Sequence, residues 1–155
     1  MNAPAIATLG AEHADLSPRG IMTYRGIVYP WHCDHMDHMN VMWYTGKFDE
    51  ASWSFLASFG VDTAYLRDRE RRMAAVEQTF RYHQELFAGD LVTIESALLE
   101  VGRRSLRFRH AMYRGESREV AAECLAVGVH LDARTRRACP LPDDVVLRAN
   151  RLLGR

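Results

Sequence analysis

One long helical pattern, followed by a series of short apolar runs, constrains the fold of this chain more than any other feature. Through residues 40–59 apolar side chains recur at helical spacing, at Val41, Tyr44, Phe48, Ala51, Phe55 and Phe59. Asn40 is a residue type that caps helix starts, and Gly60 is a type that ends helices. A helix of about 30 Å is expected, which is long enough to be the central element of a small domain.

The other patterned segments of the chain are typical of β-strands separated by tight turns. Strands are expected at residues 21–29, 74–84, 91–101, 105–114 and 118–131. The glycine-containing turns at 102–104 and 115–117 are short, which favours antiparallel pairing of the strands that they join. Residues 67–72 are expected to form a basic loop, and residues 143–153 a short terminal helix.

Together these elements predict an α+β domain. A sheet of this size must bury its apolar face, and the single long helix is the available partner, so we expect an antiparallel sheet wrapped around that helix. The 155 residues fit one such domain. Residues 20–155 are predicted to form it, and residues 1–19 a flexible leader. The start of the chain has Glu12 and Asp15 but no basic residue or long apolar block, unlike a signal peptide.

The charge of the chain excludes some classes of partner. Twenty acidic and twenty basic residues give a formal net charge of zero, so bulk charge does not indicate a nucleic-acid or membrane-surface protein. No apolar run approaches the length needed to span a bilayer. Cys33, Cys124 and Cys139 have no regular spacing, and their odd number argues against a disulfide framework. We therefore expect a cytoplasmic protein.

The densest group of titratable side chains lies just before the long helix. Residues 32–38 contain three histidines, two aspartates and a cysteine. Ligands this close along one loop rarely all converge, and no HExxH or CxxC spacing is present, so no metal site is predicted. His32 and His35 are expected to be solvated or hydrogen-bonded loop residues.

Asp34 has a more specific interpretation. Unpaired N–H groups at a helix start can hold a carbonyl oxygen and stabilise the oxyanion that forms when the carbonyl is attacked. A carboxylate beside them could attack the carbonyl or activate a water. Asp34 or Asp37 could equally be a simple helix cap. The residues alone leave both interpretations open.

A family resemblance favours the first interpretation. Asp34-x-x-x-His38-x-Asn40, then Tyr44 and Phe48-Asp49-Glu50-Ala51, resembles the hot-dog-fold acyl-CoA thioesterases of the 4-hydroxybenzoyl-CoA thioesterase type. The resemblance continues at Phe80-Arg81-Tyr82, Gly89-Asp90, residues 101–106 and Pro140-Leu141-Pro142, and covers about residues 22–146. It implies hydrolysis of an acyl-CoA to the free acid and coenzyme A, without a metal or cofactor. It also implies a homodimer, often a homotetramer, with sites between subunits.

The resemblance assigns roles to residues of the loop and helix. Asp34 matches the catalytic carboxylate, the backbone N–H of Val41 the oxyanion donor, and Tyr44 an aromatic position one turn further on; His38 belongs to the same motif. Asp37 stands where the family usually has glycine, and Val41 stands where it often has a second asparagine. Aspartate tolerates a left-handed backbone, but a second carboxylate so near would disfavour the ionised form of Asp34.

Other acids and bases are weighed beside these. Asp49 and Glu50 offer an alternative acid, because a related branch of hot-dog enzymes places its carboxylate on the helix. Arg103 and Arg104, followed by Ser105, are expected to contact coenzyme A phosphates, although solvated turn arginines would show the same pattern. Arg71, Arg72, Arg136 and Arg137 are weaker candidates for this contact. Trp31, Trp43 and Tyr44 could line an acyl pocket or, with Asp37, cage a cationic acyl group; core packing is expected for at least one tryptophan.

Two other functions remain open from the sequence. A dehydratase or hydratase acting on acyl carriers would oppose a histidine and an acid, such as His38 and Glu50. A non-catalytic regulator would bind acyl-CoA without turning it over, and Asp37 in place of glycine keeps this alternative open.

Overall fold

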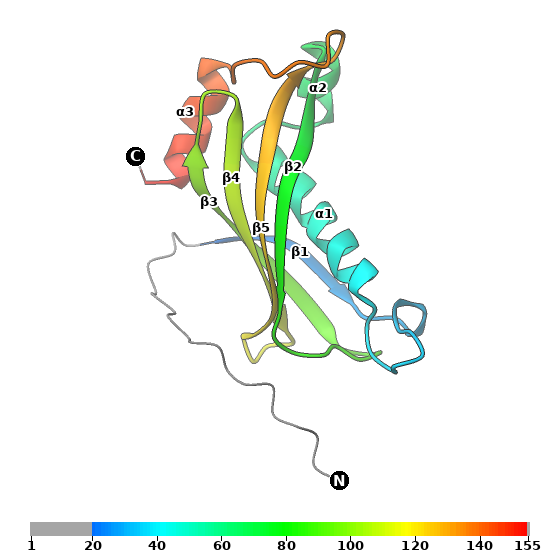
Figure 1. The fold of residues 1–155 in the computed structure, drawn as a ribbon. Helices are drawn as coiled ribbons and strands as arrows, with labels where there is room; N and C mark the ends of the chain where they lie inside the picture. The colour runs from blue at the N-terminus through cyan, green and yellow to red at the C-terminus, as the bar shows by residue number, and fades with distance from the viewer. Residues whose placement is uncertain (1–19, 155) are drawn as a thin grey trace.

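The computed structural model describes residues 20–154, and the predicted leader at residues 1–19 lies outside them. In chain order the elements are β1 (Ile21–Ile27), a 3-10 turn (Pro30–His32), α1 (Val41–Ser58), α2 (Thr63–Asp68), β2 (Arg71–Tyr82), β3 (Leu91–Val101), β4 (Ser105–Arg114), β5 (Glu119–Asp132) and α3 (Asp143–Leu152). The strands form one antiparallel sheet in the order β1-β3-β4-β5-β2, with α1 along one face (Figure 1). This confirms the α+β class and the hot-dog arrangement.

The prediction of a basic loop at residues 67–72 is wrong. Residues 63–68 form α2, and β2 begins at Arg71. Asp62 caps this short helix by accepting a hydrogen bond from the Tyr65 backbone N–H at 2.8 Å. The Tyr65 ring is buried, and its hydroxyl lies 2.9 Å from Nε2 of the buried His130. Tertiary burial of one side chain thus holds a segment that has no apolar periodicity of its own.

The core lies between α1 and one face of the sheet. Phe48, Ala51 and Phe55 are almost fully buried, as the helical periodicity predicted. The ring of Phe55 packs 5.6 Å from that of Phe108 on β4. At the end of α1, Gly60 adopts a φ of +90°, a left-handed conformation that residues with a Cβ rarely adopt.

A chain of polar side chains crosses this core and joins α1 to three strands. Thr23 Oγ1 lies 2.6 Å from Ser96 Oγ, which lies 2.6 Å from His110 Nδ1. His110 Nε2 is 2.9 Å from Ser52 Oγ, and that hydroxyl donates to the Phe48 carbonyl. Because the Ser52 proton is used there, the geometry fits a neutral His110 that donates from Nε2 and accepts at Nδ1. Burial lowers the pKa of His110 to about 4, which agrees with a neutral ring.

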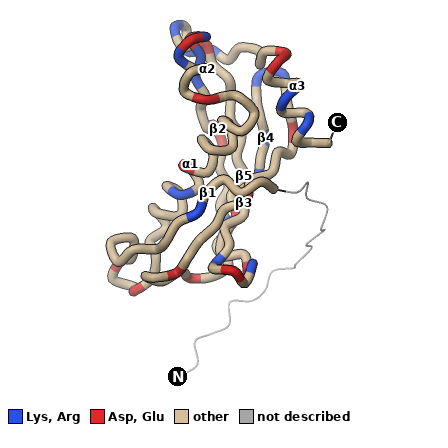
Figure 2. Tube along the Cα trace, turned by 180° about the vertical axis from the view of Figure 1, so that it is seen from behind, with Lys and Arg blue, Asp and Glu red and all other residues tan. Residues whose placement is uncertain are grey.

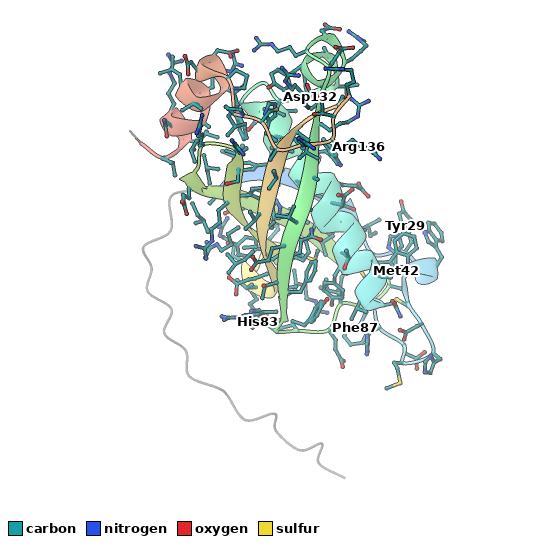
Figure 3. The ribbon with its side chains drawn as sticks, turned by 45° about the horizontal axis from the view of Figure 1, so that its top comes forward. Tyr29, Met42, His83, Phe87, Asp132 and Arg136 are labelled. Carbon is teal, nitrogen blue, oxygen red and sulfur yellow. The ribbon has the colours of Figure 1, made fainter. Side chains whose placement is uncertain are left out.

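The two ends of α1 lie at opposite ends of the molecule. The loop at residues 28–40 meets the start of α1, beside Tyr29 and Met42, whereas Asp132 and Arg136 mark the far end (Figure 3). There, Arg148 Nε donates to the Phe59 carbonyl at 2.8 Å, and the Leu141 N–H donates to the Arg103 carbonyl at 2.9 Å. The 18 residues of α1 separate these ends by about 27 Å. Within residues 20–154, no helix combines the length and apolar character needed to cross a bilayer.

Candidate active site

The site begins with a tight turn at residues 34–37. The Asp37 N–H donates to the Asp34 carbonyl at 3.0 Å, and the Asp34 N–H donates to the His38 carbonyl at 3.2 Å. Asp37 has a φ of +63°, so it adopts the left-handed conformation that the family's glycine would supply. Cys33 and Met39 then pair across the loop as an isolated antiparallel bridge. The departure from glycine at position 37 is therefore compatible with the turn, as predicted.

Two donors hold the carboxylate of Asp34. Oδ1 accepts from the Met36 backbone N–H at 2.9 Å, and Oδ2 accepts from Asn40 Nδ2 at 2.6 Å. These bonds stabilise the ionised form, the backbone bond most strongly, and nearby histidines add to the effect, so the pKa of Asp34 lies below its usual value. The ionised form is therefore favoured even with a second carboxylate at Asp37, which is not among the causes of the shift. Asp34 is a solvent-accessible anion at neutral pH.

Asn40 connects this carboxylate to the start of α1. Its Oδ1 accepts from the Met42 N–H at 2.9 Å, which makes Asn40 the predicted N-cap. Its Nδ2 simultaneously donates to Asp34. Sequence reasoning identified the cap but missed the second bond. The spacing of six residues across a turn with a left-handed position was the available signal.

The backbone N–H of Val41 is the free donor at this helix start. No acceptor among residues 20–154 takes a hydrogen bond from it, whereas the next two N–H groups are bonded to Asn40. Val41 itself is exposed. An unpaired N–H at the positive end of an 18-residue helix, next to Asn40 and hence to Asp34, is well placed to hold a carbonyl oxygen.

Tyr44 and His38 lie near the loop but have other partners. Tyr44 is buried, and its hydroxyl donates to the Gln84 carbonyl at 3.2 Å. Burial raises the pKa of Tyr44 to about 12, so the phenol stays protonated. His38 Nδ1 is 3.3 Å from the Met39 carbonyl, and its Nε2 is 3.8 Å from the Glu85 carboxylate. Tyr44 thus packs beneath the site.

Glu50, the alternative acid, is not brought to Asp34 within one chain. It is exposed on α1 nine residues after Val41, about 14 Å further along the helix. Asp49 is exposed at the adjacent position. The carboxylate beside the free N–H of this chain is therefore Asp34.

The predicted coenzyme A contacts lie at the opposite end of the molecule. Arg103 and Arg104 are exposed in the β3–β4 turn, and Ser105, the first residue of β4, accepts from the Gly102 N–H at 2.8 Å. The His130 N–H donates to the Arg104 carbonyl at 2.8 Å, which fixes the turn near the far end of α1. Within one chain, these three residues therefore lie far from Asp34.

The aromatic residues of the loop divide into exposed and packed rings. Trp31 is 65% exposed and stacks on Tyr29 with ring centroids 4.3 Å apart. Trp43 packs against the core and lies 4.4 Å from the ring of His32, which confirms core packing for one tryptophan. His32 is buried and accepts at Nδ1 from the Tyr29 N–H at 3.0 Å, as expected of a hydrogen-bonded loop histidine.

No metal-binding arrangement is evident in the described part of the chain. Among residues 20–154, no three histidine, cysteine or carboxylate side chains are grouped as ligands of an ion. The two aspartates of the loop instead belong to a hydrogen-bonded turn.

Comparison with known proteins defines the class. The family model for the thioesterase-like superfamily matches residues 28–149, which include the loop, α1 and the whole sheet except β1. The chain therefore belongs to the thioesterase-like superfamily. No curated protein matches the sequence.

Solved structures share the fold at low sequence identity. The hypothetical protein SAV2348 from Staphylococcus aureus, solved in complex with CoA, aligns with a TM-score of 0.81 and 18% identity over 87% of this chain and 85% of that chain. Slr0204, a 1,4-dihydroxy-2-naphthoyl-CoA thioesterase from Synechocystis, aligns with a TM-score of 0.73 and 16% identity over 83% of this chain and 95% of that chain. The DHNA-CoA thioesterase from Staphylococcus aureus aligns with a TM-score of 0.76 and 13% identity over 84% of this chain and 89% of that chain.

Proposed function

We propose that this protein hydrolyses an acyl-CoA thioester to the free acid and coenzyme A. One observation carries the proposal: an ionised Asp34 and the free N–H of Val41 are joined through Asn40 at the start of α1. Membership of the thioesterase-like superfamily and the fold shared with CoA thioesterases support it.

The chemistry follows from these two groups. The thioester carbonyl oxygen accepts a hydrogen bond from the Val41 N–H, which stabilises the negative charge of the tetrahedral intermediate. In one route, Asp34 attacks the carbonyl carbon, coenzyme A leaves as a thiolate, and water hydrolyses the acyl–aspartyl anhydride. In the other, Asp34 takes a proton from the water that attacks. Both routes need the carboxylate ionised, and its hydrogen bonds favour that form.

A single turnover in ¹⁸O-labelled water helps to separate the routes. Label that appears in the Asp34 carboxylate, with unlabelled acid released, requires the anhydride. Direct attack by water instead always places one labelled oxygen in the acid.

We propose a homodimer formed along β2. This strand ends the sheet and exposes most of its residues, including Val76, and such edges commonly pair with a second copy. An antiparallel copy runs in the opposite direction, so the end that carries Arg103 and Arg104 in one copy lies at the same end as the 28–40 loop of the other. The coenzyme A contact of Arg103, Arg104 and Ser105, the homotetramer and the cytoplasmic location stay predictions.

The geometry does not favour the dehydratase alternative. His38 is directed to the Met39 carbonyl and Glu85, and Glu50 lies two and a half turns along α1 from the loop. The remaining alternative is a non-catalytic regulator, which an assay of thiol release distinguishes from a thioesterase.

The test is release of free thiol from a panel of acyl-CoAs. Asp34→Asn should lower turnover by about a hundredfold or more, because a positioned base or nucleophile is lost. Glu50→Gln serves as the matched control and should leave turnover nearly unchanged. A large loss in Glu50→Gln with normal turnover in Asp34→Asn would move the catalytic carboxylate onto the helix. Acyl-CoA binding without thiol release would indicate a regulator.

A further inference from the structure

A cavity of about 820 Å³ opens at the end of the molecule opposite Asp34. It lies between the second half of α1, α2, the start of β2 and the residues that follow β5. Basic and acidic positions both lie along the chain around α2 (Figure 2). The residues that matter for its chemistry are Trp53, Leu66, Arg67, Glu70, Arg72 and Arg134. None of them belongs to the loop around Asp34 or to the β3–β4 turn.

The cavity has an excess of positive charge. Three arginines line it against one glutamate. Arg67 pairs with Asp68 at 2.7 Å, but Arg72 and Arg134 form no ion pair with any carboxylate of residues 20–154. The Arg72 guanidinium donates only to the Arg71 carbonyl, at 2.8 Å. Two guanidinium groups without a counter-ion on a concave wall suit an anion such as a phosphate ester.

The remaining wall is flat and apolar. Trp53 is 44% exposed, and no aromatic ring of the described chain stacks on it. Leu66 of α2 lines the same cavity. Indole faces stack on nucleobases, so a planar base that carries phosphate matches this combination of wall and charge.

The exposed face of α1 connects this cavity to Asp34. Met42, Gly46 and Trp53 lie on one side of the helix, because their spacings of four and seven residues return to the same face. Trp53 lies about 20 Å along the helix from Asn40. A Cβ added at Gly46 would meet no atom within 4 Å, so packing within the chain does not require glycine there. Glycine leaves the middle of this face open to an extended chain that runs along the backbone.

We propose that the cavity binds the adenosine 3′-phosphate end of coenzyme A. Arg72 and Arg134 hold phosphate, Trp53 stacks on the adenine, and the pantetheine arm runs along the face of α1 toward Asp34. This rests on the proposed thioesterase function. It places the nucleotide in the cavity, as an alternative to the predicted contact with Arg103 and Arg104 of the β3–β4 turn.

Calorimetric titration with adenosine 3′,5′-bisphosphate tests the site. Arg72→Ala with Arg134→Ala should weaken binding by about tenfold or more, since charge-assisted hydrogen bonds are lost. Glu70→Gln should tighten it several-fold at low salt, because a like charge leaves the wall. Arg107→Ala with Arg151→Ala removes two exposed arginines outside the cavity and should change nothing. Equal affinity in Arg72→Ala/Arg134→Ala and the unaltered protein would overturn the proposal.

The turn provides a second decisive comparison. If Arg103→Ala with Arg104→Ala weakens bisphosphate binding while the cavity variant does not, the nucleotide lies at the turn and the cavity proposal is wrong. A preference for coenzyme A over its 3′-dephospho form that disappears in the cavity variant would support the assignment of the 3′-phosphate.

Hydrolysis of a pantetheine thioester, which lacks the nucleotide, separates this inference from the proposed function. The cavity variants should hydrolyse it as the unaltered protein does. Normal hydrolysis with arginine-independent bisphosphate binding would reject the cavity alone. Arginine-dependent binding without hydrolysis of any thioester would reject the enzyme and keep the nucleotide site.

Discussion

Stability of this fold should fall between pH 6.5 and 4 because of His110. The ring is fully buried, and the rings of Phe48, Phe55 and Phe108 surround it at 5.1 to 6.5 Å. This environment lowers its pKa from 6.5 to about 4. Above pH 6.5 the ring is neutral in both folded and unfolded chains and contributes no pH dependence. As the pH falls through 6.5, the unfolded chain takes up a proton that the folded chain refuses until about pH 4.

The size of the effect follows from that window. Each pH unit within it lowers the free energy of unfolding by about 1.4 kcal/mol, so the full loss is about 3 kcal/mol near pH 4. Such a loss is a large fraction of the free energy of unfolding of a typical domain, which is about 10 kcal/mol. Lowered carboxylate pKa values, such as those of Asp132 and Asp144, add a separate loss that becomes important at lower pH.

Urea unfolding of the unaltered protein and of His110→Gln, at several pH values from 7 to 4, measures the effect. His110→Gln should be less stable at pH 7, because the bonds to Ser52 and Ser96 change, but its pH dependence should be shallower by about 3 kcal/mol over the window. His35→Gln removes an exposed histidine and should follow the unaltered protein. Parallel curves for His110→Gln and the unaltered protein would refute the argument, as would an NMR titration of His110 with a midpoint near 6.5.

Three further changes test the helix, the carboxylate and the assembly. Gly46→Ala should raise stability by about 1 kcal/mol, or about 2–4 °C in melting temperature, while raising KM for acyl-CoA; a lowered melting temperature would contradict it. Asn40→Ser keeps a capping oxygen but removes the bond to Asp34, so the acid limb of the pH–rate profile should move to higher pH. Val76→Lys should shift light scattering from dimer to monomer, and a monomeric unaltered protein with full activity would count against a shared site.

The strands and α1 could be predicted because their signals are local. The turn at residues 102–104 and the apolar runs beside it gave the bounds of β3 and β4, and helical periodicity gave α1 to within a residue at each end. The structure places β2 at residues 71–82, earlier than the expected 74–84. The short helix α2 was missed because it depends on the burial of Tyr65 against His130, 65 positions away in sequence.

The candidate site was predictable in its parts but not in its contacts. Residue types identified Asp34 and the cap at Asn40, since both act within a few positions of the helix start. The bond between them depends on the left-handed turn at Asp37, which sequence alone only permits. The buried polar network is still harder to predict from the sequence, because His110 bonds to Ser52 across 58 positions. Arg72 was only a weaker candidate and Arg134 was not predicted at all, because only the fold brings these two arginines to one wall.

Asn40 couples the formation of α1 to the placement of the Asp34 carboxylate. One side chain closes the first turn of the helix at Met42 and fixes Asp34 beside it. If the first turn of α1 frays, the Val41 N–H loses its orientation and Asp34 loses a donor, so both groups of the proposed site are lost together. A carboxylate that served only as a cap would bond to the helix N–H groups itself. Here the amide of Asn40 takes the capping role and leaves Asp34 facing solvent, which is the arrangement that a nucleophile or base requires.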